Sequence, residues 1–445
     1  MWRASNPRSG PVSLAKKPNI GYRTACYLRV FLEFSPVIPR IPISSASSDP
    51  GNRGELYCDG QVTSERGLSA GARPRSTPSW ISQMRIIVVQ DYLRSGGTER
   101  QAVSLCHEFQ DAGASSMLLT FRPGGRLVAF AEQLSVEHRS LMKIDLGMVF
   151  FAPGLSKTLK RERPDVVLCM GKNANSYAGY LQIRLPGTAV VGTLRSGKPL
   201  ARQNLWSFRR LPATIANTRW WKSRLVELGL DSERVHVIPN GLGRRWDFSR
   251  REVARAQIRG KLGASAPDVV LLNVAGFRPG KRHERLVQMV SKLPDCLNWK
   301  LWLVGDGPRL DACRQLVRSL GMEDRVHFAG HVSDPFAYYA GADIAVSVSA
   351  EDALPNFIVE AQSLALPVVA SACRGVAEAF DDGATGYLTP LDEDGEFLDR
   401  LAGLISSPGT REEMGEKARN RAIRLHDPGH QARQYLEIFE SLHLR

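Results

Sequence analysis

Two successive series of short apolar runs, alternating with helical segments, constrain this chain more than any other feature of its sequence. The first series begins at Ile86–Gln90 and the second at Val269–Val274. Strands that alternate with helices predict parallel sheets covered by helices. We therefore expect an α/β fold of two Rossmann-like domains, joined near Gly241–Arg251 and facing each other across a cleft. Ligands of such sheets bind at the carboxyl ends of the strands.

The first series lies between residues 86 and 238. Its strands are expected at Ile86–Gln90, Ser116–Thr120, Pro164–Cys169, Ala189–Thr193, Thr214–Ala216 and Val235–Ile238. Its helices are expected at Glu99–Ala112, Asn175–Arg184 and Trp220–Leu228. Gly113 is expected to end the first of these helices, because glycine readily adopts the left-handed conformation found at helix ends.

The second series lies between residues 269 and 389. Its strands are expected at Val269–Val274, Trp299–Val304, Val326–Phe328, Ile344–Val348, Val368–Ala370 and Gly386–Thr389. Its helices are expected at Glu284–Leu293, Arg309–Leu320, Phe336–Ala342, Pro355–Ala365 and Val376–Phe380. Residues 410–445 are expected to be helical, with a break at Pro428-Gly429.

The domain organisation follows from length and composition. At 445 residues the chain exceeds what one hydrophobic core usually holds. Residues 1–83 contain 13 Ser, 9 Pro and 7 Gly, so we expect an N-terminal extension that is disordered or lies upstream of a natural start at Met84. Residues 84–245 and 246–425 are expected to form the two Rossmann-like domains, and residues 426–445 a C-terminal helix.

The net charge of +14 is concentrated in the first of these domains. Residues 84–245 carry 24 basic and 12 acidic side chains, whereas residues 246–445 carry 24 and 28. The excess indicates an anionic partner such as nucleic acid, phospholipid headgroups or a phosphorylated substrate. A merely basic, solvated surface is the alternative.

Apolar runs and cysteines indicate the compartment. No stretch reaches the roughly 18 to 20 apolar residues of a membrane-spanning helix. The seven cysteines contain no Cys-x-x-Cys pair, and with the histidines they form no cluster at zinc-ligand spacing. We expect buried, reduced thiols, no bound metal, and a cytoplasmic protein that is soluble or peripheral on the inner face of the membrane.

The most specific segment runs from Ser349 to Ala361, with the sequence SAEDALPNFIVEA. It leads from the end of an expected strand, through a loop, into a helix that Pro355 can initiate at its first position. Such a junction offers free backbone N–H groups to a phosphate. Asp352 lies in the loop and Glu360 within the helix, and a carboxylate can accept hydrogen bonds from sugar hydroxyls.

This segment resembles the acidic signature of the family 4 (group 1) glycosyltransferases, an acid followed after seven residues by Glu, here Asp352 and Glu360. Glu351 is one residue out of register. Further segments that look like this family are Ile238–Gly241 (IPNG), Leu303–Arg309 (LVGDGPR), Val326–Gly330 (VHFAG) and Gly383–Leu388 (GATGYL). The resemblance covers roughly residues 84–445 and is densest from 235 to 390.

The resemblance implies the GT-B architecture and a retaining transfer of a sugar from a nucleotide-diphosphate sugar to a saccharide or lipid-linked saccharide. The donor would bind mainly in the C-terminal domain and the acceptor mainly in the N-terminal one. It also implies that no metal and no other cofactor is needed, because positive side chains and helix N-termini meet the charge of the diphosphate. The nucleotide sugar is then a co-substrate.

The resemblance also assigns residues to these roles. Lys281 would bind the diphosphate and Asp352 the donor sugar, which makes them the expected catalytic pair; Glu360 would hold the ribose. The implied donor-binding residues are Gly96, Gly97, Arg278, Gly305, His331, Val332, Leu354, Pro355, Asn356, Phe357 and Glu360. Independently of the resemblance, fixed cations and N–H dipoles lower the barrier by stabilising the charge that grows on a leaving diphosphate.

The sequence departs from the family pattern at two places. The usual Arg before Lys281 is replaced by Gly276, so that Arg278 or Arg282 would have to supply its charge. Many members have a His after a middle strand of the N-terminal domain, where this chain has Cys169–Asn175 (CMGKNAN). The expected acceptor-side residues are Lys172, Asn173, Arg195 and Lys198.

Two aromatic pairs indicate possible partners. Trp220-Trp221 beside Lys222 is compatible with single-stranded nucleic acid, but we favour an amphipathic helix that packs one Trp inward, and no nucleic-acid partner. Phe150-Phe151 beside Lys157, Lys160 and Arg161 fits an anionic membrane surface, and core or hinge packing explains the pair about as well.

Two alternatives to a transferase remain at this point. A nucleotide-sugar epimerase of the same architecture would need catalytic carboxylates and histidines around the sugar ring, and the N-terminal half offers few: His107 lies in an expected helix and His138 in an expected loop. A non-catalytic nucleotide-sugar-binding protein is supported by the two departures alone. A nicotinamide site at Gly305-Asp-Gly307 is disfavoured, because Leu310 stands where the third glycine of the fingerprint belongs.

Overall fold

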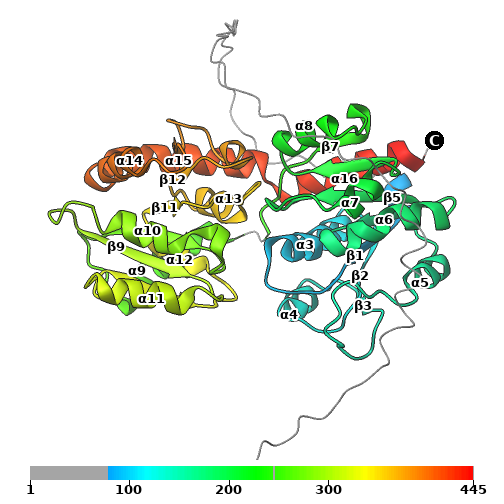
Figure 1. The fold of residues 1–445 in the computed structure, drawn as a ribbon, viewed down its shortest axis with the longest axis horizontal. Coiled ribbons are helices and arrows are strands. Elements are labelled where there is room, and N and C mark those ends of the chain that lie inside the picture. Colours follow the sequence, from blue (N-terminus) through cyan, green and yellow to red (C-terminus); the bar gives the residue numbers. More distant parts are fainter. Residues whose placement is uncertain (1–78, 244–245, 444–445) are drawn as a thin grey trace, which may run out of the picture. The chain divides into compact units, whose positions relative to one another are not determined.

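The computed structural model describes residues 79–243 and 246–443, and Figure 1 labels many of their elements. Residues 1–78, which make up most of the expected N-terminal extension, lie outside the described residues. The described chain forms two parallel β-sheets in succession, each with helices before and after its strands. The predicted α/β class with two Rossmann-like sheets is confirmed.

The first sheet has seven strands in the order β3-β2-β1-β4-β5-β6-β7. These strands are β1 (Arg85–Gln90), β2 (Ser115–Thr120), β3 (His138–Ser140), β4 (Val166–Cys169), β5 (Ala189–Leu194), β6 (Ala213–Ala216) and β7 (Val235–Val237). The accompanying helices are α2 (Ser79–Gln83), α3 (Gly97–Asp111), α4 (Val128–Gln133), α5 (Leu155–Glu162), α6 (Lys172–Arg184), α7 (Arg202–Phe208), α8 (Arg219–Glu227) and the 3₁₀ turn η1 (Ser232–Arg234).

The second sheet has six strands in the order β10-β9-β8-β11-β12-β13. These strands are β8 (Val269–Val274), β9 (Trp299–Val304), β10 (Val326–Gly330), β11 (Ile344–Ser347), β12 (Val368–Ser371) and β13 (Gly386–Thr389). The helices and 3₁₀ turns in this part of the chain are η2 (Phe248–Arg250), α9 (Arg251–Lys261), η3 (Pro279–Lys281), α10 (His283–Val290), α11 (Leu310–Ser319), α12 (Phe336–Gly341), α13 (Asn356–Ser363), η4 (Val376–Glu378), α14 (Asp394–Ser406) and α15 (Pro408–Leu425), followed by the C-terminal α16 (Pro428–His443).

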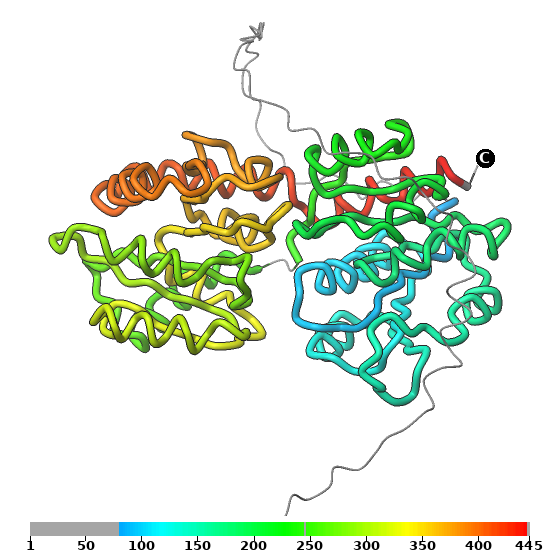
Figure 2. Tube along the Cα trace, in the orientation of Figure 1, coloured from blue at the N-terminus to red at the C-terminus, as the bar shows by residue number. Residues whose placement is uncertain are grey.

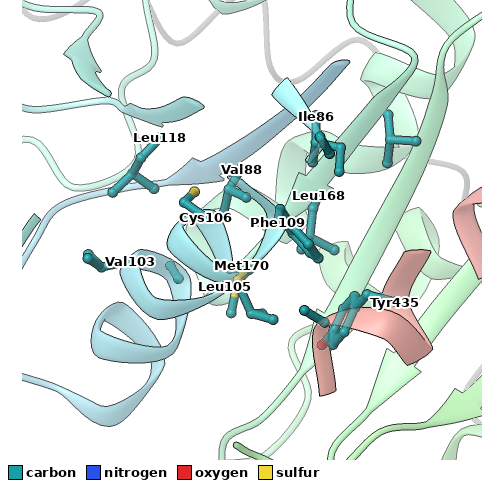
Figure 3. Close-up of a cluster of buried hydrophobic side chains, with 14 of the residues drawn as sticks. Ile86, Val88, Val103, Leu105, Cys106, Phe109, Leu118, Leu168, Met170 and Tyr435 are labelled. Atoms are coloured by element: carbon teal, nitrogen blue, oxygen red, sulfur yellow. The ribbon is translucent and has the colours of Figure 1, made fainter. Parts of the chain in front are cut away.

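Each sheet is buried on both faces, which explains why its strands read as continuous apolar runs. In β1, Ile86 and Val88 belong to one buried cluster, whereas Ile87 and Val89 belong to another. This alternation is the period of two that a strand imposes on its side chains. Figure 3 shows Ile86 and Val88 of the first cluster together with Leu118 and Leu168 from the neighbouring strands.

Strand order reverses once in each sheet, and these reversals determine where a ligand can bind. In the first sheet the chain moves outward from β1 to β2 and β3, and then returns to the other side of β1 with β4. In the second sheet the same reversal lies between β8 and β11. Crevices at such switch points, beyond the carboxyl ends of the strands, are the usual ligand sites of open parallel sheets.

Helix α16 packs against the first sheet although it follows the second in sequence. Its Tyr435 and Phe439 are buried, and their ring centroids lie 6.1 and 5.8 Å from that of Phe109 on α3. Figure 3 shows Tyr435 close to Phe109, and Figure 2 shows the red C-terminal segment among the segments of the first sheet. The C-terminal helix expected near residues 426–445 therefore completes the core of the first half.

Several expectations need correction. The expected boundary at Met84 lies too late, because α2 precedes it and Ile81 is buried in the first core. His138, expected in a loop, lies in β3, and its ring nitrogen lies 2.9 Å from Thr120 Oγ1. The described elements for which we had no expectation are α2, α4, β3, α5, α7, α9, α14 and the 3₁₀ turns η1, η2 and η3.

Within residues 79–243 and 246–443, no helix combines the length and the apolar character needed to cross a membrane. Four described cysteines are buried free thiols, as expected: Cys106, Cys169, Cys313 and Cys373. Cys296 is exposed, contrary to that expectation. The prediction that one Trp of the Trp220-Trp221 pair packs inward is confirmed, because Trp221 is buried on α8.

Candidate active site

The switch point of the second sheet brings together Lys281 and Asp352, the expected catalytic pair. Lys281 ends the 3₁₀ turn η3 after β8, and Asp352 lies in the loop after β11. Lys281 Nζ donates to both carboxylate oxygens of Asp352, at 2.6 and 2.7 Å. The side chains of Lys281 and Asp352 are 28% and 15% exposed, so the pair is partly accessible to a ligand.

Close backbone contacts hold the two loops together. The carbonyl of Gly280 accepts hydrogen bonds from Ala350 N at 2.9 Å and from Ser349 Oγ at 3.0 Å. A Cβ atom at Gly280 would lie 2.7 Å from a carboxylate oxygen of Glu351, which is closer than real contacts allow. Glycine at 280 therefore lets the Glu351 side chain pack against this loop, and the acid that pairs with Lys281 is Asp352, not Glu351.

Helix α13 begins directly after this loop, with an N-terminus that no side chain caps. Pro355 occupies the N-cap, one position before the first helical position at which we expected it. Leu354 and Phe357, both expected to bind the donor, are buried in the second core, so only their backbones can face a ligand. Backbone N–H groups of an uncapped first turn suit a phosphate.

Glu360 lies one turn further along α13 and is held by a buried tyrosine. Tyr339 Oη donates to Glu360 Oε2 at 2.6 Å. Burial raises the pKa of Glu360, while Arg100 on α3 and the hydrogen bond from Tyr339 lower it. The carboxylate is thus half-buried and has a single hydrogen-bond donor among the described residues.

The positions of Arg278 and Arg282 show which of them can supply the positive charge that Gly276 lacks. The guanidinium Nε of Arg278 lies 3.8 Å from the point where a Cβ of Gly276 would be. Arg278 is exposed, and no ion pair engages it within the described residues. Arg282 instead donates to Asp392 at 2.7 Å. Arg278 is therefore the available cation beside Gly276.

The remaining expected donor residues of this half lie at the carboxyl ends of β9 and β10. Gly305 has a positive φ of 148°, and a Cβ there would collide with the carbonyl of Ala275. Its N–H donates to the carbonyl of Gly330 at 2.8 Å. His331 and Val332 follow directly, with His331 exposed and Val332 packed against the core.

The Gly-Gly turn of the first half reaches the same helix α13. Gly96 is the N-cap of α3 and Gly97 its first residue. A Cβ at Gly97 would lie 2.7 Å from Asn356 Nδ2, and this amide donates to the carbonyl of Gly97 at 3.4 Å. The turn and the start of α13 are thus adjacent, as a shared diphosphate site would require.

The switch point of the first sheet holds an acid that sequence reasoning missed. Asp91 directly follows β1 and is buried. It accepts hydrogen bonds from Asn173 Nδ2 at 2.8 Å and from Arg94 Nη2 at 2.9 Å. Lys172, the first residue of α6, is exposed beside Asn173. The position of Asp91 immediately after the first buried strand was the signal that could have identified it.

Arg195 and Lys198, the other expected acceptor-side residues, differ in their surroundings. Arg195 is buried and donates to Asn240 Oδ1 at 2.9 Å and to Tyr435 Oη at 3.1 Å. This placement joins the linker to α16 and gives no support to acceptor binding by Arg195. Lys198 is exposed, and a Cβ at the preceding Gly197 would lie 2.5 Å from the carbonyl oxygen of Glu351. Lys198 is therefore close to the acidic loop.

Family models match both halves of the chain. The model described as "Glycosyltransferase Family 4" matches residues 95–243, and the model described as "Glycosyl transferases group 1" matches residues 254–421. The two matches lie on either side of the linker between the sheets, and the second covers Lys281, Asp352 and Glu360.

Individual proteins that resemble this chain in sequence or in structure were also found. Lipopolysaccharide core biosynthesis glycosyltransferase LpsE of Rhizobium meliloti is 26% identical over 331 residues, which are 73% of this chain and 90% of that protein. N-acetyl-alpha-D-glucosaminyl L-malate synthase of Bacillus anthracis is 28% identical over 193 residues, or 43% and 50% of the two chains. The crystal structure of Anabaena Alr3699/HepE with UDP and glucose has a TM-score of 0.70 at 22% identity, covering 80% of this chain and all of that one.

Proposed function

Because the chain belongs to the family 4 (group 1) glycosyltransferases, we propose that it transfers a sugar from a UDP-sugar to a saccharide or lipid-linked saccharide, with retention at the anomeric carbon. The observation that carries this proposal is the Lys281–Asp352 pair at the switch point of the second sheet. UDP is the nucleotide bound to the Anabaena protein, and we extend it to this chain.

The residues at this switch point have complementary roles in the proposal. Lys281 and the first-turn N–H groups of α13 stabilise the negative charge that grows on the leaving diphosphate. Asp352 fixes the ammonium group of Lys281 and accepts a hydroxyl of the donor sugar. Arg278 supplies positive charge beside Gly276, which stands where the family usually has an arginine. Glu360 accepts hydrogen bonds from the ribose hydroxyls.

The acceptor site in this proposal lies at the switch point of the first sheet. Asn173 is held there by Asp91, and Lys172 lies beside it. The acceptor oxygen bonds to the anomeric carbon as the bond from that carbon to the diphosphate oxygen breaks. The electron pair of the broken bond leaves with the diphosphate, which then takes the proton of the acceptor hydroxyl.

Replacing Glu360 with alanine is expected to weaken UDP binding by roughly 1.5–3 kcal/mol, because a hydrogen bond to a charged group is lost. The measurement is a thermal-shift titration of the full chain with UDP, GDP, ADP and dTDP. A nucleotide at about 100 times its Kd should stabilise the protein by roughly 2.7 kcal/mol.

The matched control is Glu396→Ala, which removes an exposed glutamate from α14. Stabilisation of wild type and Glu396→Ala by UDP, but not of Glu360→Ala, supports the proposal. Equal stabilisation of all three proteins by UDP would remove the ribose role of Glu360. Stabilisation by another nucleotide alone would replace UDP as the donor nucleotide.

We also propose that the first half docks on an anionic membrane surface, through the apolar loop 144–151. Large apolar side chains are exposed along this loop, with Ile144 73% and Phe150 66% exposed. Lys157, Lys160 and Arg161 are exposed on the adjacent helix α5. This combination suits the boundary between anionic headgroups and acyl chains.

Charge pairing around the loop strengthens this proposal. Asp145, the acid within the loop, accepts two hydrogen bonds of 2.6 Å from Arg122. The hydroxyl of Tyr177 on α6 donates to the carbonyl of Phe150 at 2.5 Å and holds the loop in place. The acid is therefore neutralised within the protein, while Lys157 and Lys160 make no ion pair among the described residues.

Co-sedimentation with vesicles tests the membrane surface. We expect binding to vesicles containing phosphatidylglycerol and little binding to pure phosphatidylcholine. Lys157→Glu combined with Lys160→Glu should lower the partition coefficient at least tenfold, because each basic residue contributes about 1 kcal/mol. Phe150→Asp should lower it further, and Leu320→Asp, at an exposed position after α11, should not. Equal binding to both lipids would contradict the proposal.

A further inference from the structure

The side chain of Tyr339 is the group that meets the carboxylate of Glu360, and its position is determined by packing. Tyr339 lies on α12 and is fully buried. Its ring centroid lies 5.0 Å from that of Trp246 and 6.1 Å from that of Phe357. Phe357 and Glu360 are three residues apart on α13 and so share one face of the helix. Both therefore meet the same tyrosine.

The hydroxyl of Tyr339 acts only as a hydrogen-bond donor toward Glu360. It lies 2.6 Å from Glu360 Oε2. Burial and the neighbouring carboxylate raise the pKa of Tyr339 well above its ordinary value, so the hydroxyl keeps its proton. Glu360 Oε1 accepts no hydrogen bond within residues 79–243 and 246–443. One carboxylate oxygen is thus fixed and the other is available.

Charges near Glu360 do not fix its orientation in this way. Arg100 on α3 attracts the carboxylate and Asp334, just before α12, repels it. Arg100 makes no hydrogen bond to the carboxylate, and its guanidinium packs over the ring of Phe130 instead. A charge at a distance favours the ionised form but leaves the side chain free to rotate. The short, directional hydrogen bond from Tyr339 is what selects one rotamer.

We propose that Tyr339 is a positioning residue that sets the selectivity of the site for a ribonucleotide, by orienting Glu360 so that its free oxygen meets the ribose hydroxyls. This inference rests on the ribose role proposed for Glu360. A carboxylate that can rotate loses part of its hydrogen-bond energy to the ordering of its side chain. Tyr339 removes that loss before the nucleotide arrives.

The experiment compares UDP with 2′,3′-dideoxyuridine diphosphate, which lacks both ribose hydroxyls. Isothermal titration calorimetry on the full chain gives Kd for each ligand with wild type, Tyr339→Phe and Tyr338→Phe. Tyr338 is the matched control, because it is the neighbouring tyrosine and its ring stacks on His327 instead. The variants differ from wild type by one oxygen atom each.

We expect wild type to prefer UDP over the dideoxy ligand by about 10- to 100-fold. Tyr339→Phe should raise Kd for UDP about tenfold, because the hydrogen bond that orients a charged group is lost. Its Kd for the dideoxy ligand should stay unchanged. Tyr338→Phe should behave as wild type does. In the Glu360→Ala background, adding Tyr339→Phe should change neither Kd, because no carboxylate is left to orient.

The outcomes separate this inference from the function on which it rests. If wild type binds UDP and the dideoxy ligand equally, the ribose role of Glu360 fails and the inference fails with it. If wild type prefers UDP and Tyr339→Phe retains the full preference, the inference alone is overturned. If Tyr339→Phe weakens both ligands equally, the tyrosine supports packing of the site and not selectivity, which also overturns the inference.

Discussion

Replacing Lys281 with alanine is expected to lower kcat by about 100- to 1,000-fold, the usual effect of removing one group that stabilises transition-state charge. The ammonium group is held by both oxygens of Asp352, at 2.6 and 2.7 Å, so its position does not have to be established during the reaction. The rate of UDP release from a UDP-sugar measures this loss. Lys281→Arg should recover only part of the rate, because a planar guanidinium differs in shape from an ammonium.

A structural role for Lys281 would give a different result, and Arg285→Ala provides the comparison. Arg285 has the same exposure as Lys281, 28%, and donates to Asp392 and Asp394 at 2.6 Å. Both variants remove a cation that donates two hydrogen bonds to carboxylate oxygens, and both should lower the free energy of unfolding by about 1–3 kcal/mol. Only Lys281→Ala should lower kcat. A parallel loss of rate in both variants would assign Lys281 to structure alone.

Acidification from about pH 6.5 to pH 4 is expected to remove several kcal/mol of stability through two buried histidines. Burial lowers the pKa of His283 to about 4, with Lys281 adding to the effect, and burial likewise lowers the pKa of His426 to about 4. Their ordinary pKa is 6.5. Below that value the unfolded chain binds protons that the folded chain does not, so stability is present above pH 6.5 and is lost as the pH falls toward 4.

The surroundings of His426 explain why protonation of this ring destabilises the folded protein. Its Nδ1 lies 2.7 Å from the carbonyl oxygen of Asn240, which makes Nδ1 the protonated nitrogen of the neutral ring. Its Nε2 is buried without a hydrogen-bond partner among the described residues, so a second proton would place a charge in the core. Each ring should cost on the order of 3 kcal/mol over the full window. The stability of a typical domain is only about 5–15 kcal/mol.

Urea unfolding at half-unit steps between pH 7.5 and 4.5 checks this prediction. His426→Asn keeps an N–H donor for the carbonyl of Asn240 and removes the titrating ring, so it should flatten the pH dependence. His283→Met should flatten it further, because the ring packs face to face on Phe277 with centroids 3.9 Å apart and an apolar side chain can fill that space. His430→Gln, at an exposed position on α16, serves as the control. An unchanged slope in His426→Asn would contradict the assignment.

Strands made of continuous apolar residues were predicted well from the sequence. A helix that packs through a buried charged side chain was not. The strands Val269–Val274 and Trp299–Val304 were expected with the bounds that the structure has. Helix α9 was not expected, because its sequence is rich in charge. In the structure Arg259 of this helix is buried, and donates to Asp343 at 3.0 Å and to the carbonyl of Ser265 at 2.6 Å. A pattern search for apolar faces cannot detect a helix that packs through arginine.

The candidate site shows the same division. Lys281, Asp352 and Glu360 could be selected because they stand at fixed spacings within recognisable segments. Tyr339 could not, because its contact with Glu360 joins residues 21 positions apart in the chain. Asp91 could have been selected from its place directly after the first strand, but its contact with Asn173, 82 positions away, could not. Arg195 was selected for its charge, and the structure shows that this charge is buried between Asn240 and Tyr435. The sequence gives the type of each residue, whereas its exposure depends on which other residues pack against it in the folded protein.

The sequence by itself determined the two parallel sheets, the family and the acidic loop, because strand-length apolar runs and local spacings are properties of contiguous residues. Only the tertiary structure decided which acid pairs with Lys281, which tyrosine orients Glu360, and that α16 completes the core of the first half. These contacts depend on the closure of long loops and on side-chain directions in the packed state. A directional contact of about 3 Å exists only once the sheets and helices have assembled.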